Sequence, residues 1–223
     1  EIAKFLIEKG ANIDEKDKGG DTPLHAACEC NNSELAEFLI EKGAKVNEKD
    51  NYGYTPLHVA CIEDNFEIAK FLIEKGANID EKNNYGYTPL HVACKENNLD
   101  MANLLIEKGA NIDEKNNYGY TPLHRACLYN NLEITKFLIE KGAKVNEKNN
   151  FGNTPLHRAC FYNNLEITKF LIEKGANIDE KNNSGKTPEE LSSNGQIKEL
   201  IKNTRQTNKE LFELLQDKNA TFE

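Results

Sequence analysis

A period of 33 residues dominates this chain of 223 residues. The tetrapeptide Thr-Pro-Leu-His recurs at intervals of 33 residues, beginning at Thr22, Thr55, Thr88, Thr121 and Thr154. A degenerate copy begins at Thr187, and residues 116–148 differ from residues 149–181 at only six of 33 positions. Units that are near-copies bury their apolar faces against neighbouring copies rather than around a common centre. The period therefore predicts an elongated stack of short supersecondary units.

Each unit is predicted to open with a short helix. Thr55 can cap this helix with its hydroxyl, and Pro56 suits the first helical position because that position needs no N–H donor. Leu57, Ala60 and Cys61 follow at helical spacing, which places mostly small apolar side chains on one face. Small side chains on that face allow neighbouring first helices to approach closely.

A second helix and a turn complete the unit. Ile68, Phe71 and Leu72 lie at helical spacing, and Gly76 can adopt the left-handed conformation that ends a helix. Residues 83–86 then supply side chains that tolerate positive φ, which is typical of a turn. The expected fold class is all-α, a solenoid of 33-residue helix-turn-helix units with turn or hairpin tips.

These features resemble the ankyrin-repeat family, which has this repeat length, the Thr-Pro-Leu-His signature and a stretch like residues 76–79 after the second helix. The resemblance covers residues 1 to about 203. The chain departs from the family pattern in two respects, because asparagine replaces the usual glycine between the helices, as at Asn97, and cysteine replaces one alanine. The resemblance implies a concave groove, lined by the turn tips and the exposed side of the first helices, that holds a partner protein.

The repeat arithmetic divides the chain into four parts. Residues 1–16 are identical to residues 67–82, so they are expected to form the second helix of a truncated repeat, with the chain beginning inside a longer solenoid. Residues 17–181 comprise five full ankyrin repeats, residues 182–203 a C-terminal capping repeat, and residues 204–223 an extra C-terminal helix and tail.

The last part of the chain is predicted to close the stack. Glu189 and Glu190 replace the Leu-His pair that would pack on a following repeat, which makes the outer face polar, and Thr187 with Glu190 forms a capping box. Residues 196–202 are expected to form a shortened second helix. Thr207 and Glu210 form another capping box, which predicts a separate helix at about 207–217.

The five histidines occupy one place in successive units: His25, His58, His91, His124 and His157. Stacked helices lie about 10 Å apart, which is too far for two of these side chains to share a zinc ion. The resemblance implies that this histidine ties adjacent units together through hydrogen bonds. We therefore expect no metal site and no catalytic histidine.

Five of the six cysteines also follow the period: Cys28, Cys61, Cys94, Cys127 and Cys160. One repeat of separation places their Cα atoms beyond the limit of about 7 Å for a disulfide, so buried free thiols are expected. Such thiols persist most easily in a reducing compartment, which favours a cytoplasmic location, or the host cytosol if the protein is a secreted effector. Cys28 and Cys30 form only half of a zinc motif.

Composition excludes several classes of function. A net charge of −9 opposes binding to the phosphates of nucleic acid, which needs clustered Lys and Arg. No apolar run exceeds four residues, whereas a membrane-spanning helix needs about 20. The chain contains no glycine-rich phosphate loop and no nucleophile elbow. We expect a monomer with no catalytic residues, no cofactor and no nucleic-acid or membrane partner.

The tyrosines are the best indication of a binding surface, because none is predicted on a core position. Six flank the turn glycine: Tyr52, Tyr54, Tyr85, Tyr87, Tyr118 and Tyr120. Tyr129 and Tyr162 lie eight residues after their threonines; Phe151 and Phe161 extend the row, with Leu128 and Ile62 in register with Phe161. Tyrosine combines a large rigid apolar area with a hydroxyl, which suits an interface. The alternative is a row of rings that merely stiffens the turn tips.

The two halves of the predicted groove carry charges of opposite sign. Glutamates occupy the N-terminal half, at Glu29, Glu63 and Glu96, whereas Arg125 and Arg158 replace valines in the C-terminal half. The expected partner is an unidentified protein or peptide with apolar anchors and with acidic groups near the two arginines.

Three other functions stay open. The chain could be a targeting arm of a larger enzyme or secreted effector whose catalytic domain lies outside it. It could be a structural spacer without a partner. A pocket for a small molecule or sugar phosphate is a third alternative, although the sequence contains no converging cluster of polar residues for it.

Overall fold

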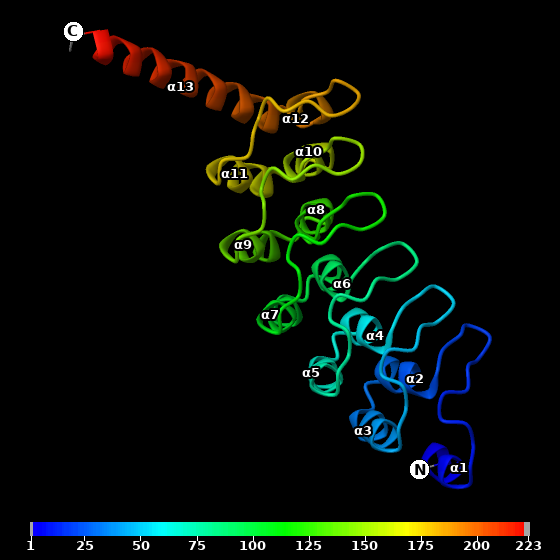
Figure 1. Cartoon of the computed structure of the whole chain (residues 1–223). Coiled ribbons are helices and arrows are strands. Elements are labelled where there is room, and N and C mark those ends of the chain that lie inside the picture. The colour runs from blue at the N-terminus through cyan, green and yellow to red at the C-terminus, as the bar shows by residue number, and fades with distance from the viewer. Residues whose placement is uncertain (1, 221–223) are drawn as a thin grey trace.

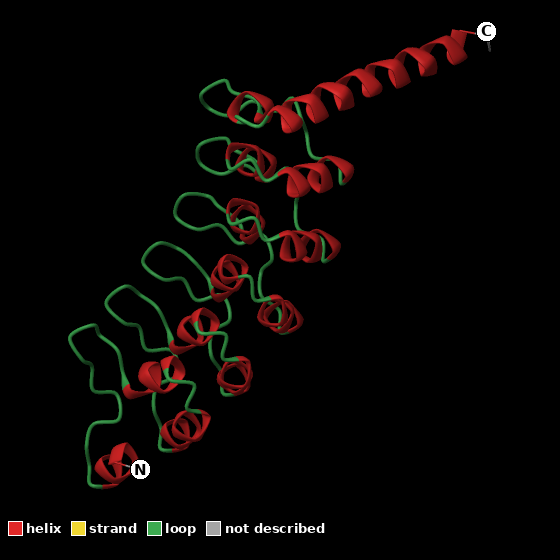
Figure 2. Ribbon diagram, turned by 180° about the vertical axis from the view of Figure 1, so that it is seen from behind, coloured by secondary structure: helices red, strands yellow, loops and turns green. Residues whose placement is uncertain are grey.

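The computed structural model describes the backbone of residues 2–220 and the side chains of residues 2–216, and the described chain consists only of helices and loops (Figures 1 and 2). The first helices of the units form one row: α2 (Pro23–Glu29), α4 (Pro56–Ile62), α6 (Pro89–Glu96), α8 (Pro122–Leu128), α10 (Pro155–Phe161) and α12 (Pro188–Leu191). The second helices form another: α1 (Ile2–Glu8), α3 (Ser33–Glu41), α5 (Phe66–Glu74), α7 (Leu99–Glu107), α9 (Leu132–Glu140), α11 (Leu165–Glu173) and α13 (Gly195–Ala220). This arrangement confirms the predicted all-α solenoid of helix-turn-helix units.

The first helices begin where the Thr-Pro pairs predict. In α6, Thr88 has an extended backbone and its hydroxyl accepts from the backbone N–H of His91, while Nδ1 of His91 accepts from the backbone N–H of Thr88. Two N–H groups that the helix cannot satisfy internally are thus paired, with histidine in the place that Glu or Gln takes in the usual capping box. The same reciprocal cap recurs at Thr22, Thr55, Thr121 and Thr154.

The core runs along the stack between the two rows of helices. In the third full unit, Leu90, Ala93 and Cys94 of α6 and Met101 and Leu105 of α7 are completely buried. The small Ala and Cys side chains let α6 pack directly against α4 on one side and α8 on the other. Burial thus follows the helical spacing of the repeat and continues without interruption from one unit to the next.

The loops between units stack as closely as the helices. The backbone N–H of Asn117 donates at 3.1 Å to the carbonyl of Tyr85, which lies 32 residues earlier in the loop of the preceding repeat. Gly86 has φ of 79°, and a Cβ there would lie 2.5 Å from the backbone nitrogen of Asn117. Only glycine fits, both because φ is positive and because the next loop is in contact. The loops form a continuous row along one side, and the stack curves towards that side (Figure 1).

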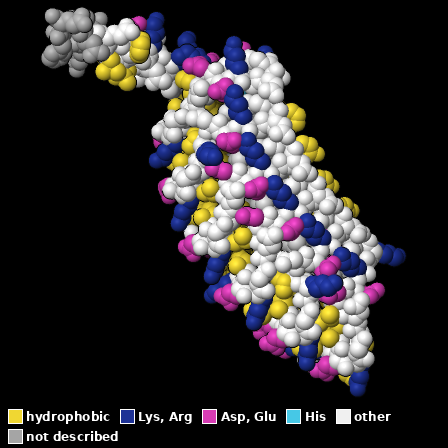
Figure 3. All heavy atoms as spheres, in the orientation of Figure 1, with side chains coloured by type: hydrophobic (Ala, Val, Ile, Leu, Met, Phe, Trp, Pro, Cys, Tyr) yellow, Lys and Arg dark blue, Asp and Glu magenta, His cyan; other side chains and the backbone are white. Residues whose placement is uncertain are grey.

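A ladder of charged side chains crosses the junctions between successive repeats as far as the fifth full repeat. Lys82 donates through Nζ to the carbonyl of Lys115 at 2.9 Å and pairs with Glu114 at 2.6 Å. Lys49 and Lys115 make the corresponding contacts one repeat earlier and later. Basic and acidic side chains accordingly follow one another along the stack in Figure 3. Because these pairs are exposed, each contributes at most about 1 kcal/mol.

The C-terminal end differs from the prediction. Residues 196–202 and 207–217 were expected to form two helices, but α13 is a single helix that continues from Gly195 to Ala220. The hydroxyl of Thr207 donates to the carbonyl of Asn203 within this helix instead of capping a new one. No proline and no glycine interrupt residues 196–220, so the helix continues past the last repeat (Figure 1). Residues 221–223 of the predicted tail lie outside the described residues.

The N-terminal helix shows how much each helix depends on its neighbours. Ile2 and Leu6 of α1 are 78% and 50% exposed, whereas the equivalent Ile68 and Leu72 of α5 are 1% and 0% exposed. Residues 2–8 and 68–74 have the same sequence, so the difference arises from the neighbours that cover α5, which are α4 of its own unit and α3 and α7 of the adjacent units.

Candidate functional site

Four aromatic residues at the loop tips form an exposed column, one per repeat. Tyr52, Tyr85, Tyr118 and Phe151 are 60%, 45%, 49% and 51% exposed. Their backbone carbonyls accept hydrogen bonds from the next loop, so the backbone is held while the rings face solvent. Apolar side chains are visible along the edge that carries the loops in Figure 3. We call these four residues the loop-tip column.

A second set of tyrosines, Tyr54, Tyr87 and Tyr120, is half-buried, and we call it the inner column. Each ring packs edge-on against the histidine of its own unit, with ring centroids 5.6 Å apart. Tyr54 also packs against the hydrophobic core. The expectation that no tyrosine takes a core position is therefore wrong for Tyr54. Tyr54 directly precedes the Thr-Pro pair, which places its ring beside the capping histidine. This position in the sequence could have indicated that the ring packs against the scaffold.

The ends of α8 and α10 carry a third group, which we call the helix-end cluster: Leu128, Tyr129, Phe161 and Tyr162. Tyr129, Phe161 and Tyr162 are 43%, 50% and 45% exposed, and Leu128 is half-buried. Phe161 and Tyr162 pack edge-on against each other with centroids 5.0 Å apart. Together the loop-tip column, the inner column, the helix-end cluster, Arg125 and Arg158 make up the groove face, which includes every candidate residue that the sequence predicted.

The two arginines are embedded in aromatic rings. The guanidinium carbon of Arg125 lies 4.5 Å from the ring centroid of Tyr87 and 4.8 Å from that of Tyr129. Arg158 stands in the same way one repeat later, 5.3 Å from Tyr120 and 5.1 Å from Tyr162. Sequence reasoning predicted the positive charge but not this stacking, because each arginine meets an inner-column ring of the preceding repeat. The replacement of valine by arginine at a fixed offset after Thr was the only signal.

The histidines are committed to the scaffold. Nε2 of His91 donates to the carbonyl of Tyr120 in the next repeat at 2.9 Å, and His58 makes the same contact to Tyr87. Burial lowers the pKa of His91 to about 3 and the pKa of His58 to about 4, so both rings are neutral at physiological pH. Both ring nitrogens of each histidine are already used, so neither histidine is placed to exchange a proton with a substrate. The expected role of these residues in tying adjacent repeats together is confirmed.

The cysteines of the first helices are equally inert. Burial raises the pKa of the Cys28, Cys127 and Cys160 thiols to about 12, and it raises those of Cys61 and Cys94 as well. A thiol rather than a thiolate is present at such positions, and a thiol is a poor nucleophile and metal ligand. Cys30, by contrast, is exposed and is the C-cap residue of α2. The predicted burial of the five periodic cysteines is confirmed.

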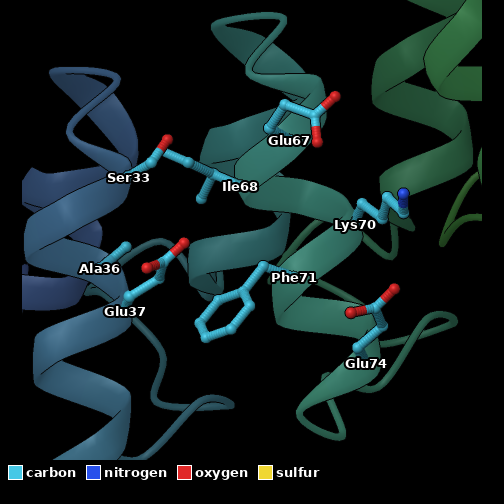
Figure 4. A pocket seen from close by; sticks show the side chains of 8 residues that line it. All are labelled: Ser33, Ala36, Glu37, Glu67, Ile68, Lys70, Phe71 and Glu74. Atoms are coloured by element: carbon cyan, nitrogen blue, oxygen red, sulfur yellow. The ribbon is translucent and has the colours of Figure 1, made fainter.

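A hollow of about 190 Å³ lies between α3 and α5, away from the groove face (Figure 4). It exists because Ser33 takes the place that Phe66 and Leu99 hold in the following units, so the first turn of α3 lacks a bulky side chain. In Figure 4, Phe71 of α5 and Glu37 of α3 point into the space between the two helices, and Glu67 and Glu74 also line the hollow. Sequence reasoning did not identify this hollow, although the serine among large apolar residues was visible.

Two further findings concern residues 2–220. No group of three or more His, Cys, Asp or Glu side chains among the described residues is arranged to hold a metal ion. Within the same residues, no helix combines the length and the apolar character needed to cross a lipid bilayer.

Comparison with known proteins gives a consistent result. Models of ankyrin repeats match residues 1–83 and 77–149 in a three-copy form, and residues 129–172 in a many-copy form. The crystal structure of the human ASB11 ankyrin repeat domain superposes with a TM-score of 0.82 at 30% sequence identity, covering 90% of this chain and 90% of that one. No curated protein sequence matches the chain.

Proposed function

The chain belongs to the ankyrin-repeat family, and on that premise we propose that it binds a partner protein or peptide through the groove face. Repeats of this family generally act as protein–protein interaction modules. The observation that carries the proposal is the cluster of exposed aromatic side chains and arginines on α8 and α10, the first helices of adjacent repeats. Aromatic residues and arginine dominate the binding energy of protein interfaces.

The exposed rings support binding because the fold does not need them. Tyr129 and Tyr162 take the position that Glu63 and Glu96 occupy in the two preceding repeats, which fold in the same way. A large apolar side chain at an exposed position that tolerates glutamate is not required for packing. Its area becomes useful when a partner removes it from water.

We also propose that the chain is not itself an enzyme. The ankyrin fold is typically non-catalytic, and the described histidines and periodic cysteines that could act as bases or nucleophiles are buried in scaffold roles. We further propose that the protein works in a reducing cytosol, because its periodic thiols are free and buried. We also propose that it is a monomer and that neither nucleic acid nor membrane is its partner, since its net charge of −9 opposes binding to nucleic-acid phosphates.

The test is the affinity of an identified partner for matched variants. Tyr129→Glu with Tyr162→Glu copies the chain's own second and third repeats, so the fold should be retained while the partner binds at least about tenfold more weakly. The control is Lys75→Ala with Lys108→Ala, which changes the ends of α5 and α7 on the other row of helices. Equal losses in both variants, or no loss in the first, would remove the groove face as the binding surface.

A further inference from the structure

Arginine appears at one register of the first helices only in the last two full repeats. The residue four positions after the capping threonine is Val59 in α4 and Val92 in α6, but Arg125 in α8 and Arg158 in α10. The valine repeats show that the fold needs no charge there. The two arginines therefore call for an explanation outside the packing of the solenoid.

Each guanidinium is held by aromatic faces and a tyrosine hydroxyl. Arg125 stacks between Tyr87 and Tyr129 and donates through Nη1 to the hydroxyl of Tyr87 at 3.2 Å. Arg158 is likewise flanked and donates through Nη2 to the hydroxyl of Tyr162 at 3.2 Å. Stacking restricts the long side chain and covers the faces of the guanidinium plane, while its N–H groups point outward in that plane.

The charges of both arginines lack a carboxylate. Among the side chains of residues 2–216, neither Arg125 nor Arg158 forms an ion pair, whereas Arg205 pairs with both Asp179 and Glu189. Nε of each groove arginine is also buried without an acceptor. In a chain with a net charge of −9, two immobilised and uncompensated cations on one face provide a specific site for anionic groups.

We infer that Arg125 and Arg158 bind two carboxylates of one acidic partner segment, three residues apart in an extended chain. This inference rests on the proposed function of the groove face. Equivalent residues of adjacent repeats are separated by about 10 Å, the distance between packed helices. A polyproline II chain has three residues per turn and rises about 3.1 Å per residue, so side chains at i and i+3 share a face about 9.3 Å apart. The segment thus carries the pattern acidic-x-x-acidic.

Carboxylates match the site better than other anions. Two guanidinium groups and two carboxylates neutralise each other one to one, and the planar guanidinium edge complements a planar carboxylate. In this conformation the two residues between the acidic positions point away from the face that carries the carboxylates, so the acidic pair alone defines the pattern.

The experiment uses four end-capped twelve-residue peptides in a proline- and alanine-rich background, titrated against the whole chain by calorimetry. Two glutamates are placed at i,i+1, at i,i+3 or at i,i+5, with leucine in the positions between them, and the fourth peptide carries glutamines at i,i+3. We expect the i,i+3 glutamate peptide to bind at least about tenfold more tightly than the other three, with the difference shrinking as salt rises. Equal affinities, or no binding by any peptide at about 1 mM, would overturn the inference.

Matched variants assign the two contacts. Arg125→Val and Arg158→Val reproduce the chain's own α4 and α6, so circular dichroism and melting should stay unchanged. In a double-mutant cycle, each variant should lose its sensitivity to replacement of one glutamate by glutamine and keep its sensitivity to the other. Arg205→Gln, which removes the arginine that is already paired, should bind the peptide like the parent chain.

The remaining outcomes separate this inference from the proposed function. A phosphoserine-x-x-phosphoserine peptide that binds more tightly than the glutamate peptide at the same salt would replace carboxylate by phosphate and overturn the inference. Selection from a random peptide library gives the other comparison. If the selected ligands depend on Tyr129 and Tyr162 but lack an acidic pair, the proposed function of the groove face holds and only the acidic pattern is refuted. If the selection yields no ligand that depends on these tyrosines, both the function and the pattern are contradicted.

Discussion

His91 joins its own helix cap to the next repeat: Nδ1 lies 3.2 Å from the backbone nitrogen of Thr88, and Nε2 lies 2.9 Å from the carbonyl oxygen of Tyr120. The N–H of Thr88 needs an unprotonated Nδ1 as its acceptor, and the carbonyl of Tyr120 needs a hydrogen on Nε2. The neutral ring satisfies both contacts, and a second proton would break the first. His58 and His124 repeat the arrangement.

Because these histidines are neutral in the folded chain, we expect the free energy of unfolding to fall in mild acid. Their pKa values in the folded chain fall to about 4, 3 and 4 for His58, His91 and His124, from 6.5 in the unfolded chain. Below pH 6.5 the unfolded chain therefore binds protons that the folded chain does not, so the stability present above 6.5 declines as pH falls. Between pH 7.5 and 5, each of these three histidines should remove about 2 kcal/mol of unfolding free energy.

Urea unfolding at several pH values measures this decline, and NMR identifies its source. The Cε1 protons of the three histidines should not titrate between pH 7.5 and 5 in the folded chain. The glutamates of the lysine ladder also have lowered pKa values, but their ordinary value of 4.5 lies below this range, so they contribute little to the decline. An unfolding free energy that is the same at pH 7.5 and pH 5 would contradict the assigned role.

Neighbouring tyrosines of one loop should differ in their importance for stability. Tyr54→Ala removes a half-buried ring that packs on His58 and the core, and is expected to cost about 1–2 kcal/mol. Tyr52→Ala, two residues away, removes a ring that is 60% exposed and should change the unfolding free energy by less than about 0.5 kcal/mol. Urea denaturation of both variants tests the distinction, and equal costs would show that the loop-tip column also belongs to the scaffold.

The thiols should fall into two classes of reactivity. A short treatment of the folded protein with iodoacetamide should modify Cys30, which is exposed, and leave Cys28, Cys61, Cys94, Cys127 and Cys160 unmodified. Burial keeps those five as unreactive thiols. Denaturation should then expose all of them to the reagent. Mass spectrometry of the digested protein gives the sites, and rapid modification of any periodic cysteine would show that its first helix opens readily.

The continuous helix α13 can be tested with one substitution. Thr207→Pro removes a backbone donor and clashes with the preceding turn, so helical circular dichroism at 222 nm should decrease. The melting transition of the repeats should change little, because α13 packs on the stack through Ile197 and Ile201, which precede the substitution. A variant with undiminished ellipticity would instead indicate a helix that starts near residue 207, since proline is accepted in a first turn.

The ends of the stack should open first, and the chain contains its own control for this prediction. Residues 2–8 and 68–74 have the same sequence, so their unprotected amides exchange at nearly the same intrinsic rates. We expect α1 to exchange much faster than α5, because Ile2 and Leu6 lack the cover that Ile68 and Leu72 receive. Hydrogen-exchange mass spectrometry compares the two peptides, and equal protection would refute the nearest-neighbour view of stability.

Local rules in the sequence were sufficient for the repeating architecture. Thr88, Pro89 and Gly109 mark where helices begin and end because capping and positive φ depend on the residues within one turn. The same period predicted burial of Leu90 and Cys94, since identical units leave only one face to share. The failure at Thr207 has the same origin: a capping box is a local preference, and it is overridden when the preceding turn is already helical and nothing interrupts it.

Contacts between repeats decided what the sequence alone did not. The order of residues shows that Arg125 replaces a valine, but Tyr87 lies 38 positions earlier and meets it only because α6 and α8 stack in register. Stacking likewise makes Tyr54 part of the scaffold and leaves Tyr52 exposed, although both flank one glycine. Helix ends are determined by neighbours along the chain, whereas the character of a surface depends on side chains that only the packing of successive units brings together.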